Sequence, residues 1–382
     1  MDAASLPPPN SAERDVLATQ LPGLIELTHN HGTEVEEGPS YHTGNSYDGC
    51  EGGFGHIGVT VPDVYASCER FKALGAAFKK SPNSGGMKGL AFIKDPDGYA
   101  IEVVHQGPSP VVQPLDCCGF SADGATAGEL PGAAPYDVGA ATCLPDVSGY
   151  YAATADAETA GFVMQQTMLR IKEPKRSLDF YTKVLGMTLI IHKEFPQYKF
   201  SLYFLGYLPA GMDAASLPPP NSAERDVLAT QLPGLIELTH NHGTEVEEGP
   251  SYHTGNSYDG CEGGFGHIGV TVPDVYASCE RFKALGAAFK KSPNSGGMKG
   301  LAFIKDPDGY AIEVVHQGPS PVVQPLDCCG FSADGATAGE LPGAAPYDVG
   351  AATCLPDVSG YYAATADAET AGFVMQQTML RI

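Results

Sequence analysis

The sequence is poor in basic residues and has no long hydrophobic run. Lys and Arg number 22 against 45 Asp and Glu, which gives a formal net charge of −23 at pH 7. Nucleic acid and anionic membrane surfaces repel such a chain, so we expect neither as a partner. No stretch approaches the length that crosses a bilayer, and the N-terminal residues have neither the basic nor the apolar region of a targeting peptide. We therefore expect a cytoplasmic protein.

The sequence also lacks the cysteine spacings of structural zinc sites and disulfide frameworks. It contains ten cysteines, but none of them belongs to a C-x-x-C pair. Cys117 and Cys118 are adjacent, and that spacing suits neither a disulfide framework nor a structural zinc ion. We expect the cysteines to be reduced thiols.

The most informative feature present is an internal repeat. Residues 1–171 recur letter for letter as residues 212–382, and only residues 172–211 occur once. This period is far too long for a solenoid, so the repeating object is a whole domain or a pair of small ones. The hydrophobic content of 43% and the charged content of 18% are typical of folded globular domains. We interpret the chain as a section of a tandem array, cut at points that can fall inside a folding unit.

One type of structural module is predicted at 163–243. Alternation of apolar and polar residues over 166–171 indicates a strand, and Pro174 then opens a helix that Gly186 ends. We expect three more strands, the last of them after a long Pro/Ser-rich loop at 208–232. The expected strands are 187–191, 199–205 and 234–239.

A second type of module has the same order of elements and occurs twice. At 262–317, a strand is followed by an amphipathic helix at 274–285, and an Asp-Pro-Asp-Gly turn at 306–309 precedes the last strand. Residues 51–106 repeat this pattern in the first copy. The strands expected in the second copy are 266–272, 287–291, 301–304 and 310–315.

The two module types alternate along the chain. Residues 107–162 and 318–373 are rich in Gly, Ala, Pro and Asp, so we predict irregular linkers there. Residues 172–211 hold the helix and two middle strands of a first-type module, and these have no second copy. The predicted order is a partial first-type module with its last strand only (1–35), a second-type module (51–106), a linker, a complete first-type module (163–243), a second-type module (262–317), a linker, and the first strand of a truncated module (374–382).

Polar side chains occur in both module types at strand positions that should be apolar. A carboxylate inside a buried strand is costly unless it is paired or binds a cation. Alone, each residue has an ordinary alternative, because a strand Glu usually faces solvent and a strand His is usually hydrogen-bonded. In both module types, however, one candidate starts the first strand and a carboxylate lies in the last strand. Two modules that face each other therefore offer a set of oxygen and nitrogen ligands for a borderline divalent metal. The candidates are Gln166, Glu237, His56, Glu102, His267 and Glu313.

Several segments, in order, resemble the glyoxalase I (lactoylglutathione lyase) family of the vicinal oxygen chelate superfamily. The similarity covers roughly 163–317, and 20–106 of the first copy. It implies an α+β fold in which repeated βαβββ modules form cupped mixed sheets around a metal. The segments are Gln165–Tyr181, Lys199–Leu205, Ile236–Asn241, Gly264–Gly269 and Met298–Tyr310.

The resemblance implies two sets of metal ligands. In fused members of the family the two inner modules share one site and the two outer modules share the other. Zinc is the usual metal in the eukaryote-like form, and nickel is the alternative. The inner set is His56, Glu102, Gln166 and Glu237, and the outer set is Glu26, His267, Glu313 and Gln377. We expect the outer site to be impaired, because the helix and two strands that would support it are missing.

The resemblance also implies the reaction. The family isomerises the hemithioacetal of methylglyoxal and its co-substrate glutathione to S-D-lactoylglutathione, by proton transfer through a metal-bound enediolate. Glu102 and Glu313 match the catalytic bases, and Glu237 and Glu26 match the partner carboxylates. The chain is then either a monomer with an intrachain pseudo-dimer or a homo-oligomer that completes the truncated module.

Further residues match family contacts to glutathione or the apolar wall around the reacting carbons. The basic and polar matches are Arg170, Asn241, Thr239, Lys80, Lys291, Asn30 and Arg381. The apolar matches are Phe195, Phe200, Leu202, Met87, Leu90, Phe92, Met298, Leu301 and Phe303, although ordinary core packing explains Leu90 and Leu202 equally well. The sequence departs from the pattern at Gly52 and Gly263, where the family commonly has Arg, and at Gly86 and Gly297, where it commonly has Lys.

Other interpretations belong to different functional classes. A non-catalytic module of the same superfamily would sequester a metal or a small ligand, and the lost Arg and Lys favour it while the retained ligands oppose it. A ring-cleaving dioxygenase needs a two-His-one-carboxylate iron set, which is absent from the matched positions. The truncated tandem can also be an assembly artefact whose real unit is a 211-residue protomer that dimerises.

Overall fold

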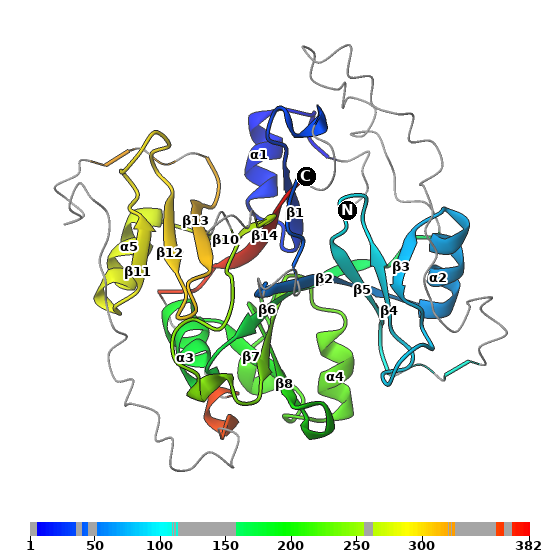
Figure 1. Ribbon diagram of the computed structural model, residues 1–382. Helices are drawn as coiled ribbons and strands as arrows, with labels where there is room; N and C mark the ends of the chain where they lie inside the picture. The colour runs from blue at the N-terminus through cyan, green and yellow to red at the C-terminus, as the bar shows by residue number, and fades with distance from the viewer. Residues whose placement is uncertain are drawn as a thin grey trace.

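The computed structural model of the chain describes residues 6–35, 40–44, 52–108, 110, 112–113, 158–255, 263–319, 321, 323–324, 357–362 and 369–382. Two mixed sheets with few helices form an α+β fold in this part of the chain (Figure 1), which confirms the predicted fold class. Most of the two predicted linkers, 107–162 and 318–373, lies outside the described residues. Among the described helices, none is long and apolar enough to cross a lipid bilayer.

The larger sheet joins the second-type module of the first copy to the complete first-type module. Its strand order is β3-β4-β5-β2-β6-β9-β8-β7. β2 and β6 pair antiparallel at the centre, and each also pairs in parallel with the last strand of its own module, β5 or β9. The strands are β2 (Phe54–Val61), β3 (Ala77–Lys80), β4 (Ala91–Lys94), β5 (Ala100–His105), β6 (Val163–Ile171), β7 (Thr188–Phe195), β8 (Phe200–Gly206) and β9 (Leu235–Asn241).

The smaller sheet repeats this arrangement, but among the described residues it has no counterparts of β7 and β8. Its strand order is β1-β14-β10-β13-β12-β11, in which β14 and β1 are the sequence copies of β6 and β9. β1 is therefore an edge strand, whereas β9 lies inside its sheet. The strands are β1 (Leu24–Thr28), β10 (Phe265–Val272), β11 (Ala288–Lys291), β12 (Ala302–Lys305), β13 (Ala311–His316) and β14 (Val374–Arg381).

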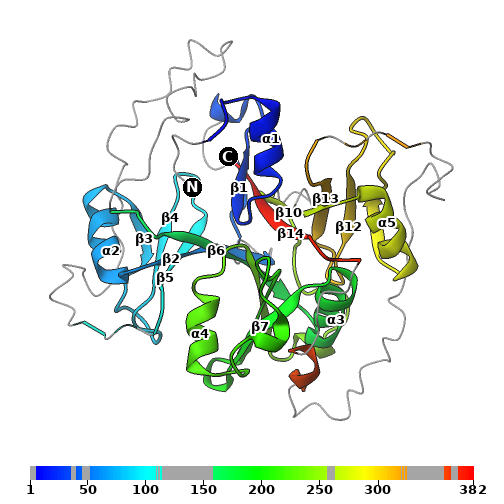
Figure 2. The same cartoon turned by 180° about the vertical axis from the view of Figure 1, so that it is seen from behind.

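The helices begin at capping side chains. Identical helices α2 (Val64–Ala73) and α5 (Val275–Ala284) flank opposite sides of the molecule (Figures 1 and 2), and Asp63 and Asp274 cap their first turns. Glu173 caps α3 (Pro174–Asp179), which continues as a π-helical turn (Phe180–Val184) up to the predicted stop at Gly186.

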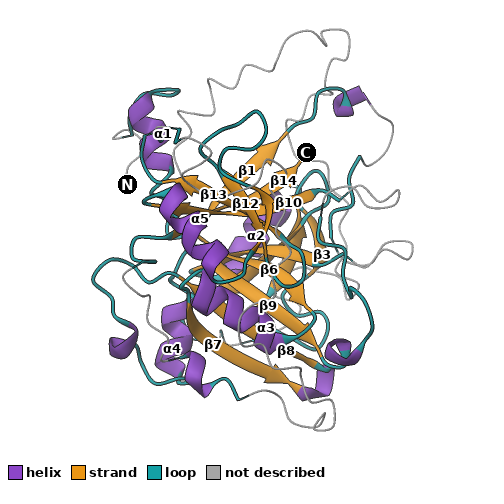
Figure 3. Cartoon of the chain, turned by 90° about the vertical axis from the view of Figure 1, so that its left-hand side faces the viewer, coloured by secondary structure: helices purple, strands orange, loops and turns teal. Residues whose placement is uncertain are grey.

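One α-helix and its sequence copy were not predicted. The loop expected at 208–232 contains the helix α4 (Ala223–Ala229), and its copy α1 (Ala12–Ala18) lies in the segment that we expected to contribute a strand only. Ser222 caps α4, and the buried Arg225 guanidinium donates hydrogen bonds to the main-chain oxygens of Leu189 and Ile190. Figure 3 shows α4 beside β7. The prediction failed because seven residues are too few to show an amphipathic pattern; the contact with β7 is not required, since the identical α1 is helical without it.

The two copies pack around an approximate twofold axis, because residues with the same position in each copy meet. The rings of Phe54 and Phe265 stack at 5.0 Å, and the hydroxyls of Thr167 and Thr378 form a hydrogen bond. A large cluster of buried apolar side chains includes residues of both copies. The copies therefore form a pseudo-dimer within one chain.

Candidate metal centre and adjoining cavity

Four polar side chains converge where the two modules of the larger sheet meet. His56 and Glu102 come from β2 and β5, and Gln166 and Glu237 come from β6 and β9. His56 Nε2 lies 3.3 Å from Glu102 Oε2 and 3.4 Å from Glu237 Oε2. The Gln166 amide donates hydrogen bonds of 2.9 and 2.6 Å to the same two oxygens. The structure thus brings together all four residues of the predicted inner set.

The sheet register explains this convergence. Gly58 of β2 lies opposite Glu102 on one side and opposite Gln166 on the other. A Cβ atom at Gly58 would come within 2.6 Å of the Gln166 side chain. The missing side chain therefore makes room for the amide, and sequence analysis did not single out this glycine.

The cluster has the donor types and spacing of a divalent cation site. The ligating atoms of His56, Glu102 and Glu237 all lie within 4.8 Å of one another. In the described structure, His56 Nε2 is buried and has no hydrogen-bond partner, although it points between the two carboxylates. One imidazole nitrogen, two carboxylates and an amide oxygen suit zinc or nickel. Because an amide ligates through its oxygen, Gln166 must turn its amide over to act as a ligand.

The carboxylates also control the charge of the imidazole. Burial lowers the pKa of His56, but Glu102 and Glu237 outweigh burial and raise this pKa to about 9. The cluster without a metal therefore holds a proton at neutral pH. A metal ligand must be a neutral imidazole, so metal binding at this position releases that proton.

A cavity of about 450 Å³ adjoins the cluster. His56, Glu102 and Glu237 line it, together with the cationic side chains of Lys80 and Arg170. The remaining lining residues are Gly86, Met87, Leu90, Phe92, Met168, Tyr198, Phe200, Leu202, Thr239 and Asn241. The structure therefore offers an apolar chamber with a carboxylate cluster and two cations around it.

Most inner-site residues predicted to bind substrate line this cavity, with one exception. Phe195 is not among the lining residues; its ring stacks on Phe200 at 4.8 Å and supports that wall. Two lining residues, Met168 and Tyr198, were not predicted. Met168 follows the alternation of β6 that already placed Gln166, so the pattern contained this signal.

Tyr198 lies in a 3-10 turn (Pro196–Tyr198) that no strand or helix pattern marks. A Cβ atom at Gly86 would come within 2.4 Å of the Tyr198 hydroxyl, whereas Gly297, its copy, has open space around it. In the inner half the tyrosine therefore occupies the space that a side chain at position 86 would need.

The predicted outer residues also come together, in a more open setting. His267 Nε2 lies 3.5 Å from Glu26 Oε2 and 3.4 Å from Glu313 Oε2, and the Gln377 amide donates hydrogen bonds to both carboxylates. The Glu26 side chain is 39% exposed, whereas that of Glu237 is 5% exposed. The difference arises because β1 is an edge strand.

The binding residues predicted for the outer half contact this cluster, hydrogen-bond to other residues or are exposed to solvent. Phe303 packs its edge against His267 at 5.3 Å, and Met298 is largely exposed. Lys291 donates hydrogen bonds to the main-chain oxygens of Met298 and Leu301. Asn30 bonds the Tyr41 hydroxyl, and Arg381 bonds the main-chain oxygen of Gly263.

The chain is similar to known proteins over most of its length. The family model described as "Glyoxalase/Bleomycin resistance protein/Dioxygenase superfamily" matches residues 9–103 and 163–314. A Schizosaccharomyces pombe lactoylglutathione lyase is 36% identical over 81% of this chain and 81% of its own length. A Saccharomyces cerevisiae glyoxalase I is 35% identical over 82% of this chain and 78% of its own.

A Pseudomonas putida lactoylglutathione lyase is 50% identical over 46% of this chain and 95% of its own length. Among solved structures, glyoxalase I from Zea mays is 26% identical and covers 69% of this chain and 68% of its own, with a TM-score of 0.41. With its two-segment family match and its relatives at more than a third identity, this chain belongs to the glyoxalase superfamily and, within it, to the lactoylglutathione lyase (glyoxalase I) family.

Proposed function

We propose that this protein is a metal-dependent lactoylglutathione lyase, which isomerises the glutathione–methylglyoxal hemithioacetal to S-D-lactoylglutathione. The observation that carries the proposal is the convergence of His56, Glu102, Gln166 and Glu237 at the wall of an apolar cavity. The lactoylglutathione lyases of yeasts and Pseudomonas that resemble this chain support the same activity.

The four converging residues would hold the ion, zinc by preference or nickel. A divalent ion bound there polarises the substrate oxygens and makes the neighbouring C–H bond more acidic. Glu102 is the base that takes the proton from C1 of the hemithioacetal and returns it to C2. Glu237 accepts described hydrogen bonds from both Gln166 and Thr239, whereas Glu102 accepts one from Gln166 alone. The less restrained Glu102 is therefore the better base.

The cavity wall would orient the substrate and keep water away. Glutathione carries two carboxylates, and Lys80 and Arg170 supply positive charge against the acidic background of the chain. The Lys80 ammonium is held near the cavity by hydrogen bonds to the main-chain oxygens of Leu90 (2.6 Å) and Ser81 (3.4 Å). Phe92 packs its edge on His56 at 5.2 Å and shields the cluster.

The proposal is tested by two measurements on one preparation. Metal content per chain and the rate of thioester formation from methylglyoxal and glutathione are measured before and after chelation. We expect activity that disappears with the chelator and returns with zinc or nickel. A chain that binds metal in this cluster but shows no turnover would instead be a sequestering module of the same superfamily.

A further inference from the structure

A turn from the smaller sheet contacts the cavity wall of the larger sheet. Residues 306–310 join β12 to β13, but the Tyr310 hydroxyl donates a hydrogen bond to the main chain of Arg170 in β6. The Arg170 side chain is a cation that lines the cavity. We propose that Tyr310 is a positioning residue for Arg170, so that a turn of one half sets the affinity for glutathione in the other half. This inference rests on the proposed function, and its test separates the two.

The main chain of Arg170 lies beyond the pairing of β2 with β6. The last pair of these strands is Phe54 with Leu169, so the carbonyl of the next residue needs another donor. The Tyr310 hydroxyl supplies it, at 2.8 Å from the Arg170 main-chain oxygen. Tyr310 is completely buried, and its ring packs edge-on against Phe265 at 6.1 Å. The tyrosine therefore holds Arg170 from a fixed position.

Two glycines before β2 bind further groups of Arg170. Its amide donates a hydrogen bond of 2.8 Å to the Gly53 oxygen, and its guanidinium donates one of 3.1 Å to the Gly52 oxygen. A Cβ atom at Gly53 would come within 1.8 Å of the Tyr310 hydroxyl, so the tyrosine packs directly on this glycine. Loss of the hydroxyl would therefore loosen both the Arg170 carbonyl and the main chain that holds its guanidinium at the cavity wall.

Two aspartates of the same turn hold the chain that follows β6. Asp308 accepts hydrogen bonds from the Lys172 amide at 3.0 Å and from the Ser177 hydroxyl at 3.2 Å. Asp306 accepts one of 3.0 Å from the Tyr181 hydroxyl. Its other oxygen accepts three main-chain amides of the turn, at 2.9 to 3.0 Å. The turn is therefore fixed in shape and is fastened to the larger sheet on both sides of its tyrosine contact.

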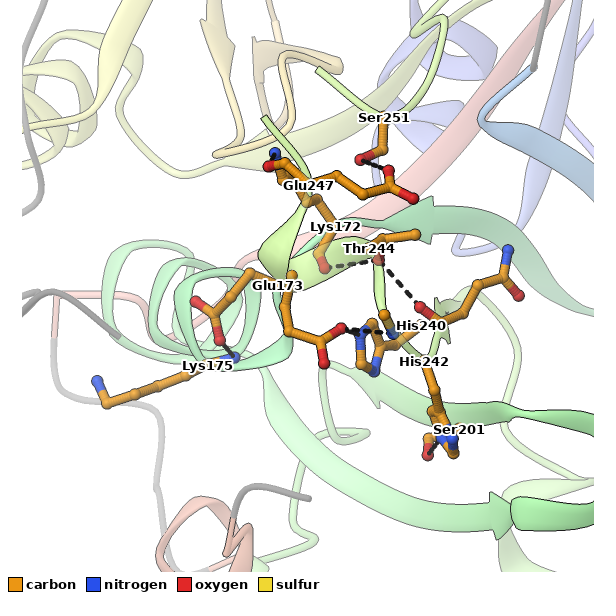
Figure 4. Close-up of polar contacts among 12 residues, drawn as sticks. Lys172, Glu173, Lys175, Ser201, His240, His242, Thr244, Glu247 and Ser251 are labelled. Carbon is orange, nitrogen blue, oxygen red and sulfur yellow. Dashed lines mark hydrogen bonds and ion pairs between the residues drawn. The ribbon is translucent and has the colours of Figure 1, made fainter. Parts of the chain in front are cut away.

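Lys172 connects this turn to the loop after β9 (Figure 4). Thr244 in that loop donates hydrogen bonds to the main-chain oxygens of Lys172 at 2.8 Å and Asn241 at 3.0 Å. The Lys172 ammonium bonds the main-chain oxygens of Glu247 and Gly249. Asn241 also lines the cavity, so the turn supports a second polar residue of the wall through Lys172.

Two histidines hold the main chain on either side of Asn241 (Figure 4). His240 bonds Glu245 at 2.8 Å, and His242 bonds Ser201 at 2.8 Å. Successive residues of a strand point to opposite faces, so the bond of His240 leaves Asn241 directed at the cavity. Both polar residues are thus held in place by contacts outside the cavity, and the contact made by Tyr310 is the one that comes from the other sheet.

The test compares Tyr310→Phe with Tyr99→Phe. Tyr99 is the sequence copy of Tyr310, is equally buried, and donates a hydrogen bond of 2.7 Å to the main-chain oxygen of Arg381. Calorimetry measures how tightly the metal-loaded chain binds S-hexylglutathione, a glutathione thioether that does not react. KM and kcat for the hemithioacetal, metal content and thermal unfolding are measured on the same preparations.

We expect Tyr310→Phe to weaken binding of the thioether and to raise KM about fivefold, the effect of one lost hydrogen bond. The kcat and the metal content should not change, because Arg170 is not one of the four converging residues. Tyr99→Phe should leave binding and KM unchanged, because Arg381 does not line this cavity. The unfolding temperatures should fall equally in the two variants, since the two turns have the same sequence.

A double variant separates positioning from a general loss of stability. Arg170→Met removes the positioned cation. When Tyr310→Phe is added to it, binding should weaken no further, because the tyrosine acts through the arginine.

Gly53→Ala is a second route to the same perturbation, because its Cβ atom would displace the Tyr310 hydroxyl. Its control is Gly264→Ala, whose Cβ atom would come within 1.8 Å of the Tyr99 hydroxyl. We expect weaker thioether binding in Gly53→Ala and unchanged binding in Gly264→Ala.

Three outcomes overturn the proposal: wild-type affinity in Tyr310→Phe, equal losses in Tyr310→Phe and Tyr99→Phe, or additive losses in the double variant with Arg170→Met. A wild-type chain that binds the thioether but shows no turnover contradicts the proposed function alone, and the affinities of the variants still decide the positioning. A metal-loaded wild-type chain that does not bind the thioether overturns both.

Discussion

Glu102 and Glu313 are sequence copies in identical local sequences, so they give a matched test of where catalysis occurs. Glu102→Gln removes the proposed base and one anionic ligand but keeps the size and the hydrogen-bonding capacity of the side chain. A general base contributes about 10²–10⁴-fold to the rate, so we expect a fall in kcat of about 10³-fold, or ~4 kcal/mol in activation free energy. Glu313→Gln should change kcat by less than about twofold, because its partner Glu26 is 39% exposed and the walls formed by β7 and β8 are missing there.

The assay is the initial rate of thioester formation, with metal content and thermal unfolding measured for both variants. Because both side chains lie in parallel strand pairs of the same register, a general effect on folding should be similar in the two variants. Equal losses of activity would show that both clusters catalyse. An active Glu102→Gln chain beside an inactive Glu313→Gln chain would place catalysis in the outer cluster and refute our choice of site.

Four further predictions concern the cavity, the two sheets and the metal. Burial lowers the pKa of Lys80 to about 8; the cation is therefore lost as pH rises through 8, and KM for the anionic substrate should rise between pH 7 and 9 in the wild type but not in Lys80→Met. Leu238→Ala should lower the free energy of unfolding by about 2–5 kcal/mol and Leu27→Ala by at most about 0.5, because only the first is buried, as urea titration can measure. Gly86→Ala should raise KM by displacing Tyr198 from the cavity wall, and Tyr198→Ala added to it should raise KM no further. Chelation should abolish activity, and zinc should restore it.

The order of the helices and strands along the chain could be predicted because short local sequence signals mark where they begin and end. Gly186, with φ of +73°, stops the helix where the pattern placed its end. β7 was predicted too short because Lys193 and Glu194 break its apolar run, although both pair with β8. The π-helical turn and α4 could not be predicted, because π geometry has no sequence period of its own and the seven residues of α4 are too few to show an amphipathic pattern.

For the candidate site, too, some features could be predicted from the sequence and others depend on the fold. The four converging residues stand out in the sequence because each is polar in an otherwise apolar strand and is matched in the resembling family. The sequence could not show that Gly58 opens the space for Gln166, since that depends on the pairing of β2 with β6. The sequence could not identify Tyr198 as a cavity residue for a similar reason, because its position is defined by its contact with Gly86, which is distant in the sequence.

Central to this account is one ion shared by His56, Glu102, Gln166 and Glu237. The most direct measurement is anomalous X-ray diffraction at the zinc edge from crystals of the metal-loaded, active chain. We predict a peak at bonding distance from His56 Nε2 and from a carboxylate oxygen of both Glu102 and Glu237. A peak bound elsewhere in the molecule, or an active crystal with no metal in this cluster, would contradict the account.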